Sequence, residues 1–193
     1  WIRAWTMDRV VRWFLDAVGA QGPRQVLSLG AGFDTTFFRL AAEGALTADL
    51  CYFEVDFADT VAQKRAHVEA HDNLEALAAG SLGVVARARY AVAPADLREV
   101  SELDSALRQL EAPAFDFSLP TLVLAEVSTC YLPSVSSDAL LTWAAHQLPR
   151  SLVAWYEQVE PRDAFGRVMC GHFTSIGSPL LSIPSYPDFD AQI

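Results

Sequence analysis

The stretch Val26-Leu27-Ser28-Leu29-Gly30-Ala31-Gly32-Phe33-Asp34 decides the fold of this chain. Its apolar first half is typical of a buried strand, and the glycines that follow let the backbone turn sharply against a ligand before a helix begins. A strand, a tight turn and a helix in this order form a nucleotide-binding geometry. A Gly-x-Gly pair also ends strands for ordinary turn reasons, so the pair needs support from elsewhere in the sequence.

That support comes from a carboxylate further along the chain. Asp56 ends a second predicted strand over residues 50–56, close to the ~20-residue offset at which a carboxylate accepts the hydroxyls of a ribose. The third glycine of the dinucleotide fingerprint is absent, because Asp34-Thr35-Thr36 stands in its place. The pattern therefore favours a ligand with a nucleoside but no diphosphate, and it disfavours a Rossmann oxidoreductase.

Length and composition predict one well-buried α/β domain. The chain has 193 residues, 52% of them hydrophobic, and a mean hydropathy of +0.19. No apolar run reaches the ~18 residues of a membrane span, and no signal-like leader precedes the first helix, so we expect no membrane association and a cytoplasmic or also nuclear location. The ends at Trp1 and Ile193 look cut. We therefore expect residues 1–193 to form a single, partial domain that is truncated at both ends.

Charge and cysteine usage narrow the range of partners. Fourteen basic and twenty-four acidic residues give a net charge of -10, which argues against an extended phosphate-binding surface within this segment. The three cysteines, Cys51, Cys130 and Cys170, contain no Cys-x-x-Cys pair and predict reduced thiols. His67 and His71 lie four residues apart on a predicted helix but lack a third ligand, so no metal is expected.

Strand patterns and helix patterns alternate along the chain, which predicts a mostly parallel, doubly wound sheet. The stretch from residue 71 to residue 88 lacks a clear helix or strand pattern and predicts an irregular excursion. Ser101 and Asp104, at the start of the helix that follows the third strand, resemble a capping box. The predicted strands cover residues 26–29, 50–56, 89–93, 119–126 and 151–157, and the predicted helices cover residues 7–18, 35–42, 57–70, 100–110 and 136–148.

Polar residues and one glycine fall at or just past the carboxyl ends of these strands: Gly30, Asp56, Asp96, Glu126 and Glu157. In open α/β sheets ligands bind beyond these ends, so we expect the residues to share one rim. Arg3 lies one turn before the apolar stripe of the first helix, from where it can face the same rim. Each residue taken alone has an ordinary structural explanation, such as a helix cap or a surface ion pair.

With these residues in place, the sequence resembles the leucine carboxyl methyltransferase family. The resemblance implies a Rossmann-like, S-adenosylmethionine-dependent methyltransferase fold, and its segments run in the family's order across nearly the whole chain. The matching segments are residues 27–40, Tyr52-Phe53-Glu54-Val55-Asp56-Phe57, Ala95-Asp96-Leu97-Arg98, Pro120-Thr121-Leu122-Val123-Leu124-Ala125-Glu126, Tyr131-Leu132 and Tyr156-Glu157-Gln158.

The resemblance also implies how S-adenosyl-L-methionine is held. Arg3 would bind the methionine carboxylate, which a guanidinium fork matches in a bidentate manner. Gly30 would pass beneath the cofactor and Asp56 would bind the ribose. The adenine would be held by Asp96 and Leu97, and Glu126 would complete the pocket.

Two branches of the family compete for the substrate. One methylates the C-terminal leucine carboxylate of the protein phosphatase 2A catalytic subunit, and the other acts in wybutosine synthesis on the hypermodified guanosine of phenylalanine tRNA. Residues 172–173, 178–180 and 186–192 look more like the tRNA branch, which often carries a kelch-type propeller beyond its methyltransferase domain. The acidic charge counts against that branch.

Both substrates present an amino-acid-like carboxylate that is already ionised at pH 7, so methyl transfer requires no general base. Catalysis would consist of removing water from the carboxylate and aligning it with the methyl group. Tyr131, Tyr156 and Arg162 are candidate substrate contacts, and either tyrosine is also consistent with a structural role. A non-catalytic nucleoside-binding module remains an alternative of another class.

Overall fold

The computed structural model describes residues 2–18, 22–79 and 89–192, with no side-chain description for Gln192. Trp1 and Ile193, where the sequence predicts cut ends, lie outside the described residues. Among the described residues, no helix is long and apolar enough to cross a lipid bilayer.

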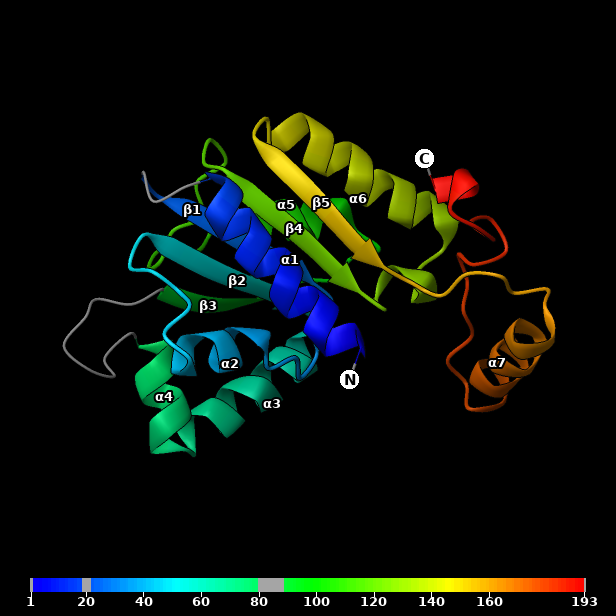
Figure 1. Cartoon of the computed structure of the whole chain (residues 1–193), viewed down its shortest axis with the longest axis horizontal. Coiled ribbons are helices and arrows are strands. Elements are labelled where there is room, and N and C mark those ends of the chain that lie inside the picture. The colour runs from blue at the N-terminus through cyan, green and yellow to red at the C-terminus, as the bar shows by residue number, and fades with distance from the viewer. Residues whose placement is uncertain (1, 19–21, 80–88, 193) are drawn as a thin grey trace.

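Five parallel strands form one sheet in the order β3-β2-β1-β4-β5 (Figure 1). The central strand β1 carries the sequence that precedes the glycine turn, and its last residue, Leu29, lies opposite Val55 on one side and Ala125 on the other. This confirms the predicted parallel, doubly wound sheet. The strands are β1 (Arg24–Leu29), β2 (Leu50–Asp56), β3 (Arg89–Pro94), β4 (Thr121–Glu126) and β5 (Ser151–Tyr156).

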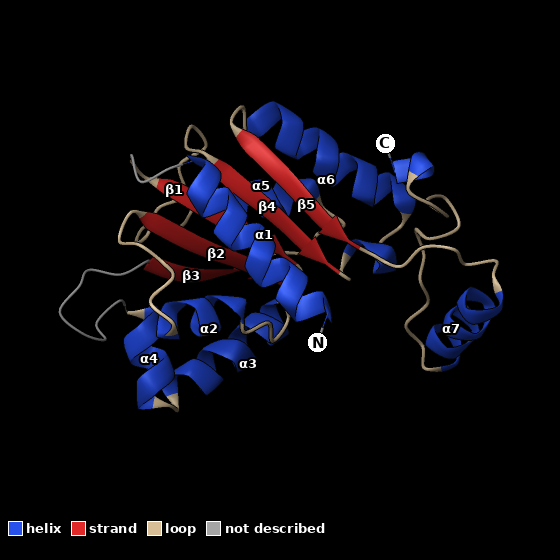
Figure 2. Ribbon diagram, in the orientation of Figure 1, coloured by secondary structure: helices blue, strands red, loops and turns tan. Residues whose placement is uncertain are grey.

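Helices cover both faces of the sheet because successive strand side chains point to opposite sides. On one face Val26, Tyr52 and Leu122 pack in a cluster with α1 (Ile2–Val18), α2 (Thr36–Ala42) and α4 (Asp72–Ala78). On the other face Leu27 and Phe53 pack with α5 (Val100–Arg108) and α6 (Ser134–Gln147). The two clusters place the strands β1, β2 and β4, which are buried except for the last residues of β2 and β4, at the centre of a three-layer domain, as Figure 2 shows.

Two further helices lie at the margins of this sandwich. Helix α3 (Ala58–Glu69) follows β2 and contacts α4 and β3. Helix α7 (Ala164–Ser175) lies beyond the carboxyl end of β5, apart from the sheet (Figure 1). Its residues Met169 and Phe173 pack on a small third cluster around Cys130 and Leu180. Two short 3-10 helices complete the described structure, at Thr129–Tyr131 and Asp190–Gln192.

Two local predictions are wrong. Residues 72–78, within the predicted irregular excursion, form helix α4, which contacts α2 and β3 and whose Leu77 is buried in the same cluster as residues of α2. Residues 80–88 lie outside the described residues. The capping box at Ser101 and Asp104 is also absent, because α5 begins at Val100 and has no side-chain cap. The Asp104 carboxylate instead accepts hydrogen bonds from Arg108 and from the indole of Trp143, so it joins α5 to α6.

Candidate functional site

The glycine turn after β1 is tied to the end of the neighbouring strand β2. The amides of Gly30 and Ala31 both donate to the carbonyl of Val55, at 2.8 and 3.2 Å. Gly30 has a φ of +66°, and a Cβ added there would lie 2.5 Å from Cβ of Ser128. Only glycine meets both demands, because a side chain strains a left-handed backbone and the segment after β4 approaches too closely. The turn is therefore built for close backbone packing.

Asp56 holds the other side of this turn. Its carboxylate accepts hydrogen bonds from the amide of Gly32 at 2.7 Å and from the amide of Phe57, also at 2.7 Å. Each carboxylate oxygen has further lone pairs that can accept from a ligand hydroxyl. Asp56 thus lies where the sequence places it, beside the turn, and it also stabilises the turn.

Two cavities open at this edge of the sheet and meet at Gly30, Val127 and Tyr131, which line both of them. One has a volume of about 440 Å³, with Asp56 and Leu97 in its wall. The other has a volume of about 820 Å³. Both volumes lie within the range of about 300–1,000 Å³ that is usual for small-molecule sites. The crevice lies where the chain order of the strands reverses around β1, as expected for a doubly wound sheet.

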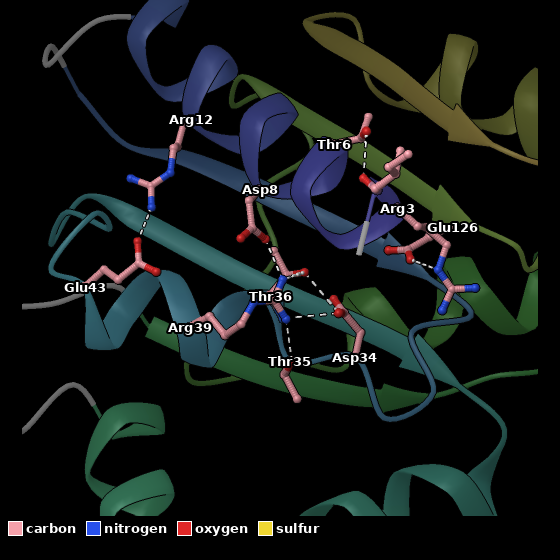
Figure 3. A network of polar contacts seen from close by, with 11 residues as sticks. Arg3, Thr6, Asp8, Arg12, Asp34, Thr35, Thr36, Arg39, Glu43 and Glu126 are labelled. Carbon is pink, nitrogen blue, oxygen red and sulfur yellow. Dashed lines mark hydrogen bonds and ion pairs between the residues drawn. The ribbon is translucent and has the colours of Figure 1, made fainter.

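The larger cavity is the more highly charged one. Arg3, near the start of α1, forms an ion pair through Nε with Oε1 of Glu126 at the end of β4, at 2.5 Å (Figure 3). Burial raises the pKa of Glu126, with a further contribution from Asp34, and the Arg3 guanidinium only partly offsets this. Four further N–H donors on the terminal nitrogens of Arg3 suit a ligand carboxylate. The structure thus brings Arg3, Glu126 and Gly30 together, as the sequence predicts.

A second ion pair in Figure 3 fixes the wall of this cavity. Arg39 of α2 contacts Asp8 of α1 at 2.5 Å and donates to the hydroxyl of Thr36 at 3.1 Å. The Thr36 hydroxyl and amide in turn donate to Oδ1 of Asp34, at 3.0 and 3.1 Å. The glycine turn is therefore continuous with α1 and α2 through side-chain hydrogen bonds.

The residues after β3 divide between the smaller cavity and the protein surface. Leu97 is buried and lines the cavity together with Ala95 and Arg98, as its predicted adenine-binding role requires. The carboxylate of Asp96 instead accepts from Nε of Arg98 at 2.9 Å, and this pairing lowers the pKa of Asp96. Asp96 is not among the residues that line the cavity. Its carboxylate is already hydrogen-bonded to Arg98, so it could contact adenine only while it also keeps this bond to Arg98.

Of the three candidate substrate contacts, only Tyr131 lies at the cavities. Tyr156 ends β5 opposite Glu126 and packs against the hydrophobic cluster that includes α1. Arg162 precedes α7, where its carbonyl accepts from the side chain of Arg167. Neither of the two lines a cavity that contains Gly30. Sequence alone could not separate Tyr131 from Tyr156, because it does not show the direction of a side chain.

The structure adds residues that sequence reasoning missed. Val127 adopts a φ of +52° directly after β4, and the hydroxyl of Ser128 donates to the carbonyl of Leu29 at 2.9 Å. Pro179 and Leu181 reach the smaller cavity from the segment after α7. A valine with a positive φ carries no sequence signal, and residues 179–181 are more than 120 positions from Asp56, so only the tertiary structure brings them together.

The carboxylate of Glu157 is hydrogen-bonded to the segment that follows β4. Its Oε1 accepts from the amides of Ser128, Thr129 and Cys130, at 3.1, 2.8 and 3.2 Å, and from the hydroxyl of Thr129. The carboxylate therefore fixes the backbone that leads from β4 to Tyr131.

Within the part of the chain that the structure describes, no group of three or more His, Cys, Asp or Glu residues is placed to hold a metal ion.

Comparison with known proteins agrees with this geometry. The chain is 38% identical over its whole length to tRNA wybutosine-synthesizing protein 4 of Homo sapiens, of which it covers 29%. It is 37% identical to a leucine carboxyl methyltransferase 1 homolog of Arabidopsis thaliana, with 90% of this chain and 53% of the relative aligned. Leucine carboxyl methyltransferase 1 of Rattus norvegicus is also 37% identical, with 87% of this chain and 52% of the relative aligned. The chain thus spans about half or less of the length of these relatives.

The fold is similar to that in a crystal structure of a Thermobifida fusca protein assigned to the methyltransferases. The TM-score is 0.62 at 19% identity, over 90% of this chain and 59% of the other. Residues 1–145 match the family model for leucine carboxyl methyltransferases, which use S-adenosylmethionine as the methyl donor. The family and the cofactor that the sequence predicts are therefore confirmed. This chain belongs to the leucine carboxyl methyltransferase family.

Proposed function

We propose that this chain, as a single partial domain, binds S-adenosylmethionine and methylates an amino-acid-like carboxylate on oxygen. The observation that carries the proposal is the pair of adjoining cavities around Gly30, one with Asp56 and Leu97 in its wall and the other with Arg3 and Glu126. A nucleoside needs a carboxylate beside an apolar wall, and an amino-acid group needs charged partners. The smaller cavity provides the carboxylate and the apolar wall, and the larger cavity provides the charged partners. The two cavities adjoin at Gly30.

The residues divide the work of holding the cofactor. Asp56 would accept from the ribose, while Leu97, with Ala95 beside it, would cover one face of the adenine. Arg3 would bind the methionine carboxylate, and Glu126 would hold Arg3 in place and lie near the amino group. Asp96 would act through its pairing with Arg98 at the edge of the adenine site. Gly30 would let the backbone pass beneath the ligand.

The bound cofactor supplies an electrophilic methyl group, and the chain's own residues prepare the acceptor. A carboxylate with a pKa of about 3.5–4 needs no base at pH 7. Positioning and exclusion of water can together contribute about 7–11 kcal/mol to such a step. Tyr131 lines both cavities, so its hydroxyl is suited to orient the acceptor carboxylate.

A matched pair of variants tests the role of Tyr131. Tyr131→Phe should lower kcat/KM by at least about tenfold, as expected for the loss of a hydrogen bond to a charged group. Tyr156→Phe removes the same atom from a tyrosine outside both cavities and should leave kcat/KM unchanged. Equal effects of the two variants would contradict the assignment.

We further propose that the acceptor is the modified guanosine side chain of phenylalanine tRNA in wybutosine synthesis. The support is the alignment of the whole chain, at 38% identity, with a tRNA wybutosine-synthesizing protein. The second candidate is the C-terminal leucine of the protein phosphatase 2A catalytic subunit. The net charge of -10 favours this second candidate, because it opposes tRNA binding by this segment itself.

Labelled methyl transfer by the full-length protein decides between the two acceptors. Hypomodified phenylalanine tRNA should accept label, and a phosphatase C-terminal peptide should not. Label in the peptide alone would assign the protein to the phosphatase branch. Calorimetry with S-adenosylhomocysteine and with NAD tests the cofactor, and binding of NAD without binding of S-adenosylhomocysteine would remove the methyltransferase proposal. Binding of S-adenosylhomocysteine without transfer to either acceptor would favour a non-catalytic nucleoside-binding module.

A further inference from the structure

The segment 127–131, which follows β4, is the boundary that the two cavities around Gly30 share. Val127 and Tyr131 at its ends line both cavities. Val127 has a φ of +52°, a conformation that few residues other than glycine adopt and that persists only where the surrounding structure holds it. The place of Tyr131 at the cavities therefore depends on what holds this segment.

The main anchor of the segment is the carboxylate of Glu157, the residue directly after β5. Three consecutive backbone amides, those of residues 128–130, donate to its Oε1. The hydroxyl of Thr129 donates to the same oxygen at 2.6 Å, and the thiol of Cys130 also forms a hydrogen bond with Glu157. Among the described residues, none of the ion pairs includes Glu157. The segment itself therefore stabilises this charge, through bonds that are about twice as strong as neutral ones.

Side chains from three other parts of the chain support the same segment. The indole of Trp155 in β5 donates to the hydroxyl of Thr129 at 2.5 Å. The hydroxyls of Ser137 in α6 and of Ser182 after α7 donate to the carbonyl of Thr129, at 3.2 and 3.1 Å. Each of these is a single neutral hydrogen bond, so none of them replaces the anchor at Glu157.

Tyr131 has two contacts that set its direction once the segment is in place. Its amide donates to the carbonyl of Ser128 at 3.4 Å. Its ring meets the ring of Phe173 in α7 edge to face, with the centroids 6.0 Å apart. Neither contact fixes the ring if the backbone of residues 128–130 moves, because the amide contact moves with that backbone.

We propose that Glu157 is a positioning residue that holds Tyr131 where its hydroxyl meets the acceptor carboxylate. The inference rests on the proposed function, in which Tyr131 orients that carboxylate. Glu157 lines neither cavity around Gly30, so it acts through the segment and touches neither the cofactor nor the acceptor. Methyl transfer is sensitive to such positioning, because a displacement of about 1 Å can cost about 100-fold in rate.

Double-variant kinetics on the full-length protein separate positioning from stability. Glu157→Gln keeps an oxygen for the amides but removes the charge. It should lower kcat for labelled methyl transfer to hypomodified phenylalanine tRNA, or to the phosphatase peptide if the wild type uses it, by about tenfold. Its effect on the affinity for S-adenosylhomocysteine in calorimetry should stay within about twofold. In protein that already carries Tyr131→Phe, Glu157→Gln should not lower kcat further, because the hydroxyl that it positions is gone.

Asp104→Asn is the matched control for a carboxylate with a structural role. Asp104 also accepts hydrogen bonds inside the protein, from Arg108 and from the indole of Trp143, but it joins α5 to α6 away from the cavities. The variant should lower Tm and leave kcat unchanged.

Crystal structures of the full-length variants with S-adenosylhomocysteine make the test independent of activity. Glu157→Leu accepts no hydrogen bond, so the ring of Tyr131 should move away from its place 6.0 Å from Phe173. If Glu157→Leu does not fold, Thr129→Val removes one of the bonds to Glu157 and should displace Tyr131 in the same direction by a smaller amount. Thr129→Ser keeps the hydroxyl and should leave Tyr131 in place.

A loss of kcat in Glu157→Gln that disappears in the Tyr131→Phe background, with a displaced Tyr131 in the crystal, would support the proposal. The same fold-loss in both backgrounds would overturn it, because Glu157 would then be merely structural. So would a Tyr131 ring that stays in place in both Glu157→Leu and Thr129→Val. A wild-type protein that methylates neither acceptor would refute the proposed function, whereas the crystal structures would still decide whether Glu157 holds Tyr131.

Discussion

The buried ion pair behind the glycine turn gives the sharpest prediction. Lys64 of α3 contacts Oε2 of Glu54 in β2, and their side chains are only 7% and 2% exposed. Lys64 also donates to the carbonyl of Asp34 at 2.9 Å, and Tyr90 donates to Glu54 at 2.7 Å. Burial raises the pKa of Glu54 to about 7 although Lys64 and Tyr90 oppose this shift. Replacement of Lys64 by methionine keeps the length of the side chain and removes its charge.

Lys64→Met should lower the free energy of unfolding by about 3–5 kcal/mol where Glu54 is ionised, because it leaves an uncompensated buried charge. The loss should depend on pH. The pKa of Glu54 in the folded wild type is about 7 and lies above its unfolded value of 4.5, so its contribution to stability is greatest below pH 4.5 and falls as the pH rises to 7. Without Lys64 the folded pKa rises further, so the decline continues to higher pH. The variant should therefore lose more stability at pH 8 than at pH 5.

Urea unfolding followed by circular dichroism at pH 5 and pH 8 measures the effect. Arg12→Met is the matched control, because Arg12 forms an ion pair with Glu43 in which both side chains are exposed, and such pairs contribute about 0–1 kcal/mol. Adding Glu54→Gln to Lys64→Met should restore much of the lost stability. A loss below about 1 kcal/mol that does not change with pH, or a double variant as unstable as the single one, would refute the reasoning.

Three further predictions concern the turn, the ribose contact and α7. Gly30→Ala should weaken S-adenosylhomocysteine binding in calorimetry and lower Tm, because the turn would have to shift away from Ser128; an unchanged affinity would show that the close packing is dispensable. Asp56→Ala should weaken the same binding by about 1.5–3 kcal/mol, and unaltered binding would contradict the ribose assignment. Asp163→Ala should cost about 1 kcal/mol in urea unfolding, because its carboxylate caps α7 at the amide of Gly166, 2.5 Å away; no change would mean that α7 contributes little to the measured transition.

The sequence determined the framework of this protein. Continuous apolar runs such as Leu122–Ala125 require burial on both faces, and their alternation with helix patterns leaves few arrangements other than a parallel sheet. The turn at Gly30 and the carboxylate of Asp56 could be located from sequence because both follow directly from a strand end. Parallel strands then bring Asp56 and Glu126 to one edge, whatever the details of packing.

Only the tertiary structure decided what each rim residue does. Asp96, Glu126 and Glu157 look equivalent in sequence, yet one is paired with Arg98, one with Arg3, and one holds the backbone after β4. These differences depend on side-chain direction and, for Glu126 and Glu157, on contacts between positions 27 to 123 residues apart, about which local propensity carries no information. Helix α4 was missed for the same reason, since one buried leucine, Leu77, anchors a helix only when the sheet beneath it is already in place.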